Sequence, residues 1–417
     1  MTIHPRTSKF EFVDGLRGVA ALQVVLLHYA SAFLPVFTRA GLPEHFAWEK
    51  AASNSPLFVA FQGYVAVYVF FIMSGFVLAG SFLNSTSPIA TQALKRSLRL
   101  YIPVAASLII AALLKLFFHS AQLHASEISG STWLTQLWSN DLSPVQFAKE
   151  LAINSMLFGY GQSSIFSHIQ FLASSQTLTP VVHSTNPPLW TLHLEFWGSI
   201  VLLMLASIIR SFPKVIARSA MLVLFVIAGT SFLSLFLIGF VTYLNVNTNN
   251  LKTSPSHSAV GLTMLGGGIL LAFIPLEHQF HHILDSISWM PVMSALDAFQ
   301  FQCEVSASLI FLGVLLCKGA RELLSSRIPQ WLGKISFSLY LTHFGILLTL
   351  GCAVFSWIRP FGYMTAVIAS TSIGLTASLL IAVPFYKYVD RTSIRISRRV
   401  AQYRHHGSAV NRQSMER

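Results

Sequence analysis

The sequence predicts an all-α polytopic membrane protein with about ten transmembrane helices and both termini in the cytoplasm. Of its 417 residues, 53% are hydrophobic and only 10% are charged, whereas about a quarter of residues in soluble proteins are charged. Apolar blocks such as residues 215–244 and 363–386 exceed the roughly 20 residues that cross a bilayer. The net charge of +12 comes from short clusters between these blocks, which is typical of cytoplasmic loops rather than of a nucleic-acid-binding face.

The order of spanning segments follows from hydropathy and from the basic clusters. Nine segments are clear candidates: residues 16–36, 57–82, 100–118, 189–209, 220–244, 260–274, 305–317, 332–355 and 363–386. Clusters of Lys and Arg near Lys95, Lys214, Lys318 and Arg391 prefer the cytoplasmic side. Nine alternating crossings would place Lys214 and Lys318 on opposite sides. We therefore expect a tenth crossing between them and assign it to the weakly apolar segment 283–299.

These spans define three regions of the chain. Residues 1–15 form a short cytoplasmic segment, residues 16–388 the membrane domain, and residues 389–417 a basic cytoplasmic tail, expected to be disordered near anionic lipid. The polar stretch at about 119–188 is then external, and its Ser, Thr, Asn and Gln residues suit either a carbohydrate-facing lid or an ordinary solvated connection. Within it, residues 147–160 are apolar enough for an interfacial or re-entrant helix.

The first helix carries ionisable residues, which cost roughly 2.5–3.5 kcal/mol each at mid-membrane and need a reason to be there. Arg17 and His28 are eleven residues apart, which places them almost on one face, with His28 roughly 16 Å deeper. Asp14 lies one turn before Arg17 and is a further polar candidate. A neutral imidazole near mid-membrane can accept a hydroxyl proton and return it to a leaving group. A structural histidine that bonds a neighbouring helix is the alternative.

Three basic residues stand at the cytoplasmic start of the third spanning segment. Arg96 and Arg99 are one helical turn apart and follow Lys95. Guanidinium groups bind phosphate through paired hydrogen bonds, so this cluster could hold an anionic donor such as coenzyme A. A simple topology signal is the competing interpretation.

A carboxylate begins the helix that follows an Asn-Pro-Pro-Leu-Trp sequence. Glu195 precedes a strongly apolar stretch, so we expect it to enter the membrane near the outer face. A carboxylate at that depth needs a partner. His28, His193 or a sugar hydroxyl could supply it, and an ion pair with an arginine is a comparable alternative.

Two further groups of polar residues require weighing. Tyr340 and His343 are one turn apart and could share a polar face, although helix packing explains them equally well. His278, His281 and His282 have spacing that a metal could use, but no acidic or cysteine ligand pattern accompanies them. We therefore expect no metal.

Taken together, the segments resemble the acyltransferase-3 family of multi-spanning membrane acyltransferases. The resemblance rests on five stretches in the family's order, beginning at Phe12 (Phe-Val-Asp-Gly-Leu-Arg-Gly), Val69 (Val-Phe-Phe-Ile-Met-Ser-Gly-Phe), Lys95 (Lys-Arg-Ser-Leu-Arg-Leu-Tyr-Ile-Pro), Pro188 (Pro-Leu-Trp-Thr-Leu-His-Leu-Glu) and Leu332 (Leu-Gly-Lys-Ile-Ser-Phe-Ser-Leu-Tyr-Leu-Thr-His). Each stretch alone is only suggestive, but five stretches in the family's order argue against a chance match.

The resemblance implies residue roles and substrates. Arg17 and His28 match the family's arginine and histidine of the first helix, Arg96 and Arg99 its paired arginines, and Glu195 its central glutamate. It further implies an acyl-CoA donor, with acetyl-CoA expected, as co-substrate without a bound cofactor. The acceptor would be a glycan or another hydroxyl compound at the bacterial inner (plasma) membrane, with membrane lipid and polysaccharide-assembly proteins as partners and no nucleic acid.

Some positions depart from the family's pattern. Tyr68 stands where many relatives have a small or acidic residue, and Asp390 replaces the usual glutamate near the end of the domain. His193-Leu-Glu replaces the commoner form with two consecutive acids. The departures at Tyr68 and at His193-Leu-Glu concern the acceptor more than the reaction.

The hypothesis is that Arg17, Arg96 and Arg99 hold acyl-CoA while His28 accepts a proton or the acyl group itself, and that Glu195 orients the acceptor hydroxyl or His28. The main alternative is a transporter or flippase in which the same buried charges bind ions or a lipid-linked sugar. The lack of internal repeats in the sequence disfavours it. A membrane scaffold would leave aligned polar residues in several helices unexplained.

Overall fold

The computed structural model describes residues 10–139, 142–161, 164, 180–229, 231–246, 255–276 and 298–402. Over these residues the regular structure is entirely helical. Eight helical segments in this part are long and apolar enough to cross a membrane. The predicted all-α membrane fold is therefore confirmed.

The long helices are α1 (Glu11–Phe33), α3 (Gly63–Leu83), α4 (Ile89–Ser129), α8 (Trp190–Ser211), α11 (Pro255–Phe273), α13 (Ala298–Leu316), α15 (Arg327–Ile346) and α17 (Tyr363–Phe385). The last two continue as π-helical turns, α15 through η6 (Leu347–Gly351) into α16 (Cys352–Ile358), and α17 into η8 (Tyr386–Asp390). Shorter helices connect them: α2 (Glu49–Ser53), η1 (Pro56–Phe61), α5 (Thr132–Gln136), α6 (Pro144–Lys149), η2 (Glu150–Phe158), η4 (Val181–His183), η5 (Pro187–Leu189), α14 (Lys318–Leu324) and η7 (Arg359–Phe361).

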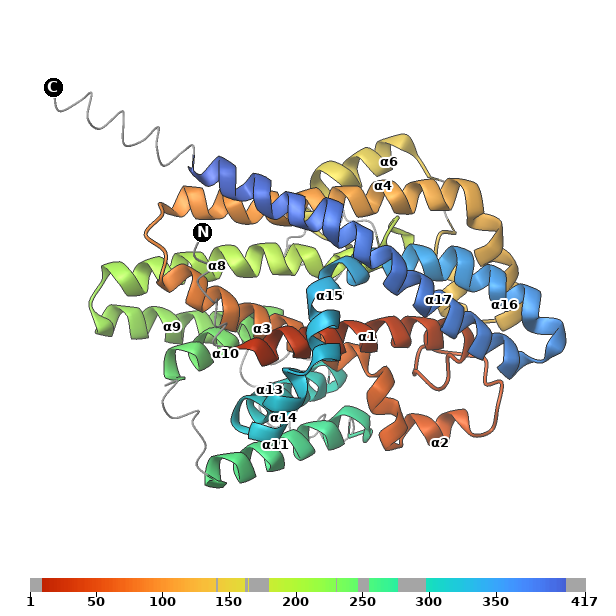
Figure 1. Cartoon of the computed structure of the whole chain (residues 1–417), viewed down its shortest axis with the longest axis horizontal. Helices are drawn as coiled ribbons and strands as arrows, with labels where there is room; N and C mark the ends of the chain where they lie inside the picture. Colours follow the sequence, from red (N-terminus) through yellow and green to blue (C-terminus); the bar gives the residue numbers. More distant parts are fainter. Residues whose placement is uncertain are drawn as a thin grey trace.

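Helices α1 and α15 form a tight pair at the centre of the molecule (Figure 1). A Cβ atom on Gly18 would lie 2.5 Å from the backbone nitrogen of Gly333, and one on Gly333 would lie 2.1 Å from the carbonyl oxygen of Asp14. Such small residues let membrane helices approach closely. Helix α1 begins at Glu11, so residues 11–15 are already helical and continue into this pair.

Residues 220–244 form two helices instead of the single crossing that the sequence predicts. Helix α9 (Lys214–Ala228) ends at Gly229, whose φ of +50° lies in the left-handed region that glycine adopts readily. Helix α10 (Phe232–Asn245) follows, and in Figure 1 the start of α9 and the end of α10 lie at the same end of the molecule. The segment 283–299, to which we assigned the extra crossing, lies outside the described residues apart from the last two, which begin α13.

The stretch 119–188 is more structured than a solvated loop. Helix α4 extends to Ser129, and residues 144–158 are helical in α6 and η2. Trp197 of α8 donates a hydrogen bond to the carbonyl oxygen of Leu157, 2.9 Å away. The predicted helix around 147–160 is therefore present and packs on α8.

The tail is helical as far as it is described. Residues 391–402 continue the helix beyond η8, and this C-terminal helix lies along α4 (Figure 1). Ser393 and Ser397 are buried there, and the Ser393 hydroxyl donates to the carbonyl oxygen of Arg99 at 3.3 Å. The prediction of a disordered tail is wrong for these residues because a small polar face packs on α4. Residues 403–417 lie outside the described part.

Candidate active site

A cavity of about 350 Å³ opens between α1, α3, α4, α8, α15 and the C-terminal helix. Ligand sites commonly measure about 300–1,000 Å³. Its charged lining residues come from five separate elements: Asp14, Arg17, Arg96, Arg99, Glu195, Lys334 and Asp390. The structure thus brings together the three arginines and the glutamate that the sequence singles out.

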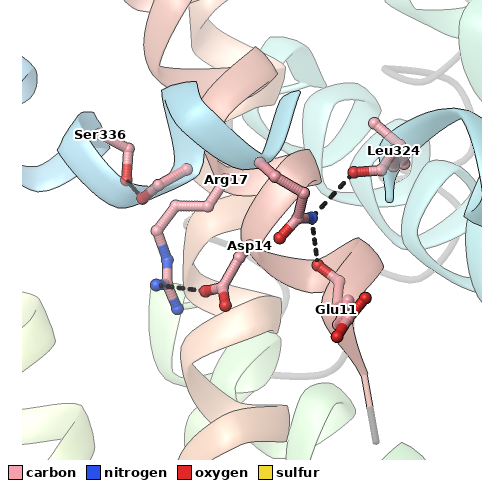
Figure 2. Close-up of polar contacts among 7 residues, drawn as sticks. Glu11, Asp14, Arg17, Leu324 and Ser336 are labelled. Carbon is pink, nitrogen blue, oxygen red and sulfur yellow. Dashed lines mark hydrogen bonds and ion pairs between the residues drawn. The ribbon is translucent and has the colours of Figure 1, made fainter. Parts of the chain in front are cut away.

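Arg17 and Asp14 form an ion pair on the first turns of α1. The guanidinium Nη1 of Arg17 lies 3.1 Å from the Asp14 carboxylate, and Figure 2 shows both side chains on the same side of the helix. The two side chains keep 29% and 53% of their surface exposed. Arg17 therefore remains accessible at the cavity edge, and Asp14 is its partner.

Glu195 binds Arg96 rather than a histidine. The Arg96 guanidinium contacts the Glu195 carboxylate in an ion pair, and the Ser74 hydroxyl donates to the same carboxylate at 2.8 Å. The ion-pair alternative weighed for Glu195 is the observed one. Glu195 and Arg96 therefore lie at the same level of the protein, so the expectations of an outer position for Glu195 and a cytoplasmic position for Arg96 do not both hold. The preceding residues Pro187–Leu189 are themselves buried, so α8 starts inside the protein.

Arg99 and Lys95 differ from Arg96 in their surroundings. Arg99 lines the cavity, stays exposed, and its guanidinium has no hydrogen-bond or ion-pair partner among the described residues. Lys95 is also exposed but does not line the cavity. A guanidinium without a partner in an open cavity is available to an anionic ligand.

His28 and His343 form a hydrogen-bonded pair away from the cavity lining. Nδ1 of His28 lies 2.8 Å from Nε2 of His343, and Nδ1 of His343 lies 3.0 Å from the carbonyl oxygen of Leu339. Because a carbonyl oxygen only accepts, His343 carries its proton on Nδ1, and its neutral Nε2 accepts from Nδ1–H of His28. This leaves Nε2 of His28 unprotonated and without a partner among the described residues.

Aromatic rings surround this pair. Trp133 of α5 stacks on His28 with ring centroids 5.9 Å apart, and Phe344 packs edge-on at 5.1 Å. His343 is fully buried, whereas His28 is partly exposed. The sequence gives no signal for Trp133, which comes from a segment about a hundred residues away.

Tyr340 connects the cavity to the histidine pair. It lines the cavity, and its ring centroid lies 6.1 Å from that of His343. Its hydroxyl donates to the carbonyl oxygen of Pro188 at 2.7 Å and also contacts the Thr191 hydroxyl at 2.7 Å. The predicted shared face of Tyr340 and His343 is therefore present.

His193 lies elsewhere. It is buried, and its Nδ1 contacts the carbonyl oxygen of Met156 in η2 at 3.2 Å. Its ring also packs on Gly159, where a Cβ atom would approach it to 2.8 Å. His193 thus holds η2 against α8 and takes no part in the cavity or the histidine pair.

Sequence reasoning did not single out Ser74 and Lys334 as site residues, although both line the cavity. Ser74 lies within the Phe-Phe-Ile-Met-Ser-Gly-Phe stretch, and Lys334 follows Gly333 in the Leu332 stretch. Their position inside those stretches was the signal available. The described residues contain no cluster of three metal-ligating side chains, and residues 277–297, with the three histidines weighed as ligands, lie outside them.

Comparisons with known proteins place the chain in a family. Residues 10–387 match the family model described as "Acyltransferase domain" of the acyltransferase-3 type. The chain is also similar to the O-acetyltransferase PaAT-1 of Phomopsis amygdali, with 24% identity over an alignment of 441 positions, which covers 93% of this chain and 83% of that protein. No solved structure matches. The chain therefore belongs to the acyltransferase-3 family and is a multi-pass membrane acyltransferase.

Proposed function

We propose that the protein is a membrane O-acyltransferase that moves an acetyl group from cytoplasmic acetyl-CoA to a hydroxyl of a carbohydrate or related acceptor. The family match and the relative with O-acetyltransferase activity support the reaction class. The donor, the acceptor and a plasma-membrane location belong to the proposal. Its central support is a basic cavity joined through Tyr340 to the His28–His343 pair.

The distance between cavity and histidines suits the donor. From Arg17 to His28 along α1 the rise is roughly 16 Å, and from Lys334 to His343 along α15 it is roughly 14 Å. The pantetheine arm of coenzyme A has a backbone as long as about four amino-acid residues, so it extends over about 14 Å. Phosphates at Arg99 and Lys334 would therefore place the thioester beside the histidines.

Nε2 of His28 is suited to act as a general base. It would take the proton of the acceptor hydroxyl as the hydroxyl oxygen attacks the thioester carbonyl carbon. The carbon–sulfur bond then breaks, and the imidazolium returns the proton to the thiolate of coenzyme A. His343 holds the neutral tautomer of His28 and stabilises its cation once formed, because its Nε2 accepts from Nδ1–H.

Arg96 and Glu195 are proposed to shape the cavity rather than to react. Their ion pair and the Ser74 hydroxyl tie α3, α4 and α8 together. The pair also offsets one of the cavity's positive charges, which leaves Arg99 and Lys334 for the donor phosphates. This replaces the role of orienting His28 that the sequence suggests for Glu195.

The transporter alternative predicts the same buried charges but no covalent product. His28 has an unprotonated, partnerless nitrogen and is linked to the cavity through Tyr340 and His343. This arrangement favours proton transfer in a reaction over ion translocation, which does not require a fixed tautomer. The two functions are separated by product analysis.

The test measures thiol release and ester formation together. Purified protein in lipid nanodiscs is incubated with acetyl-CoA and extracted surface glycans. Free thiol is measured by a colorimetric assay, and glycan masses are measured by mass spectrometry. We expect an acetyl mass increment with wild type and a loss of at least about a hundredfold in rate with His28→Ala. The exposed histidine variant His124→Ala serves as the matched control. Unchanged glycan masses and no wild-type thiol release would refute the proposal.

A further inference from the structure

The mouth of the cavity is built where the C-terminal helix lies on α4. Asp390 and Ile394 line the cavity from this helix, and Ser393 bonds the backbone of Arg99. Ser397, one turn later, is 1% exposed. The helix therefore packs against the first turns of α4.

This contact brings like charges together. Arg398 of the C-terminal helix and Arg99 of α4 lie close enough to Lys95 for their charges to act on it. Lys95, Arg99 and Arg398 are all exposed, and none of the three forms an ion pair with a carboxylate in the described part of the chain. Like charges close together repel, and a bound anion relieves this repulsion.

The cavity is small for a whole coenzyme A molecule. At about 350 Å³ it stands at the low end of ligand pockets, which commonly measure about 300–1,000 Å³. With the pantetheine arm directed at the histidine pair, we expect the adenosine and its 3′-phosphate to lie at the mouth. Lys95 is one helical turn, or about 6 Å, farther from the histidine pair than Arg99.

We propose that Lys95 and Arg398 form a subsite for the 3′-phosphate of coenzyme A, an inference that rests on the proposed function. The 3′-phosphate is a terminal dianion, and one ammonium with one guanidinium neutralises it through charge-assisted hydrogen bonds. The subsite makes the C-terminal helix a specificity element that separates coenzyme A from donors without this phosphate.

The test compares two ligands that differ only in this group. Binding of coenzyme A and of 3′-dephospho-coenzyme A is measured by isothermal titration calorimetry on the full chain in nanodiscs of uncharged lipid. Wild type is expected to bind coenzyme A at least about tenfold more tightly. Arg398→Ala and Lys95→Ala are expected to weaken coenzyme A about tenfold each while leaving the dephospho compound unchanged. Arg218→Ala, an exposed arginine of α9, is the matched control.

Several results would overturn the subsite. Equal wild-type affinity for the two ligands, or equal weakening of both by Arg398→Ala, would show that Lys95 and Arg398 do not bind the 3′-phosphate. A preference that disappears in nanodiscs with anionic lipid would assign the cluster to lipid headgroups. Because binding is measured without turnover, failure of acetyl transfer with intact discrimination would refute the proposed reaction and leave the subsite standing.

Discussion

The Arg96–Glu195 ion pair offers a quantitative test of how the cavity is held. The two side chains are only 11% and 18% exposed, and removing one partner of a buried pair leaves an uncompensated charge that costs about 3–5 kcal/mol. We expect Arg96→Met and Glu195→Gln each to lower the free energy of unfolding by about 3 kcal/mol. The double variant lacks both charges and is expected to lie within about 1 kcal/mol of wild type.

The assay is a double-mutant cycle by SDS-induced unfolding of the purified protein in mixed micelles. The exposed pair Lys318–Glu322, with an N–O distance of 3.6 Å, provides the control cycle, for which a coupling below about 0.5 kcal/mol is expected. If the effects of Arg96→Met and Glu195→Gln simply add, the pair is not coupled and the reasoning fails.

Four further outcomes follow from the site and the fold. Arg99→Ala is expected to raise the KM for acetyl-CoA about tenfold in initial-rate assays without changing unfolding; an unchanged KM would contradict a donor contact. His343→Ala is expected to lower kcat by about ten- to a hundredfold at constant KM, because the His28 tautomer is no longer fixed; a change in KM alone would count against this role. Burial raises the pKa of Glu150, so the folded state holds this proton more tightly and stability falls as pH rises above the ordinary carboxyl pKa. Glu150→Gln should flatten the profile of melting temperature against pH, and parallel profiles would argue otherwise. Finally, cysteines at positions Lys214 and Lys318 are expected to react with an impermeant maleimide from the same membrane side, and labelling from opposite sides would exclude the α9–α10 reversal as the missing crossing.

The fold class could be predicted because bilayer thickness imposes long apolar segments that are visible in any single sequence. The break at Gly229 could not, since a glycine within an apolar run is also common in continuous membrane helices. The charge pattern indicated a crossing missing between Lys214 and Lys318, and we assigned it to residues 283–299, which the structure describes only at the last two positions. Hydropathy records the sum of apolar residues and is insensitive to a reversal between two short helices.

The candidate site was predicted in part. Helical spacing placed Arg17 and His28 on one face, and the separation of cavity and histidine pair agrees with it. Partners across helices carry no such signal: nothing in the sequence specifies that Glu195 meets Arg96, or that His28 meets a residue 315 positions later. Those contacts depend on tertiary packing, which only coordinates provide.

The glycine contact between α1 and α15 has a mechanical consequence. His28 lies ten residues after Gly18, and His343 lies ten residues after Gly333. Because both helices have the same rise per residue, the two histidines lie at the same distance from the glycine contact. The glycine contact thus fixes the register of α1 against α15 about 15 Å from the imidazoles. A larger side chain at Gly18 or Gly333 would shift one helix along the other. The 2.8 Å hydrogen bond between His28 and His343 tolerates little of such a shift. Two glycines that take no part in the reaction thereby determine whether His28 is held in the tautomer that can act as a base.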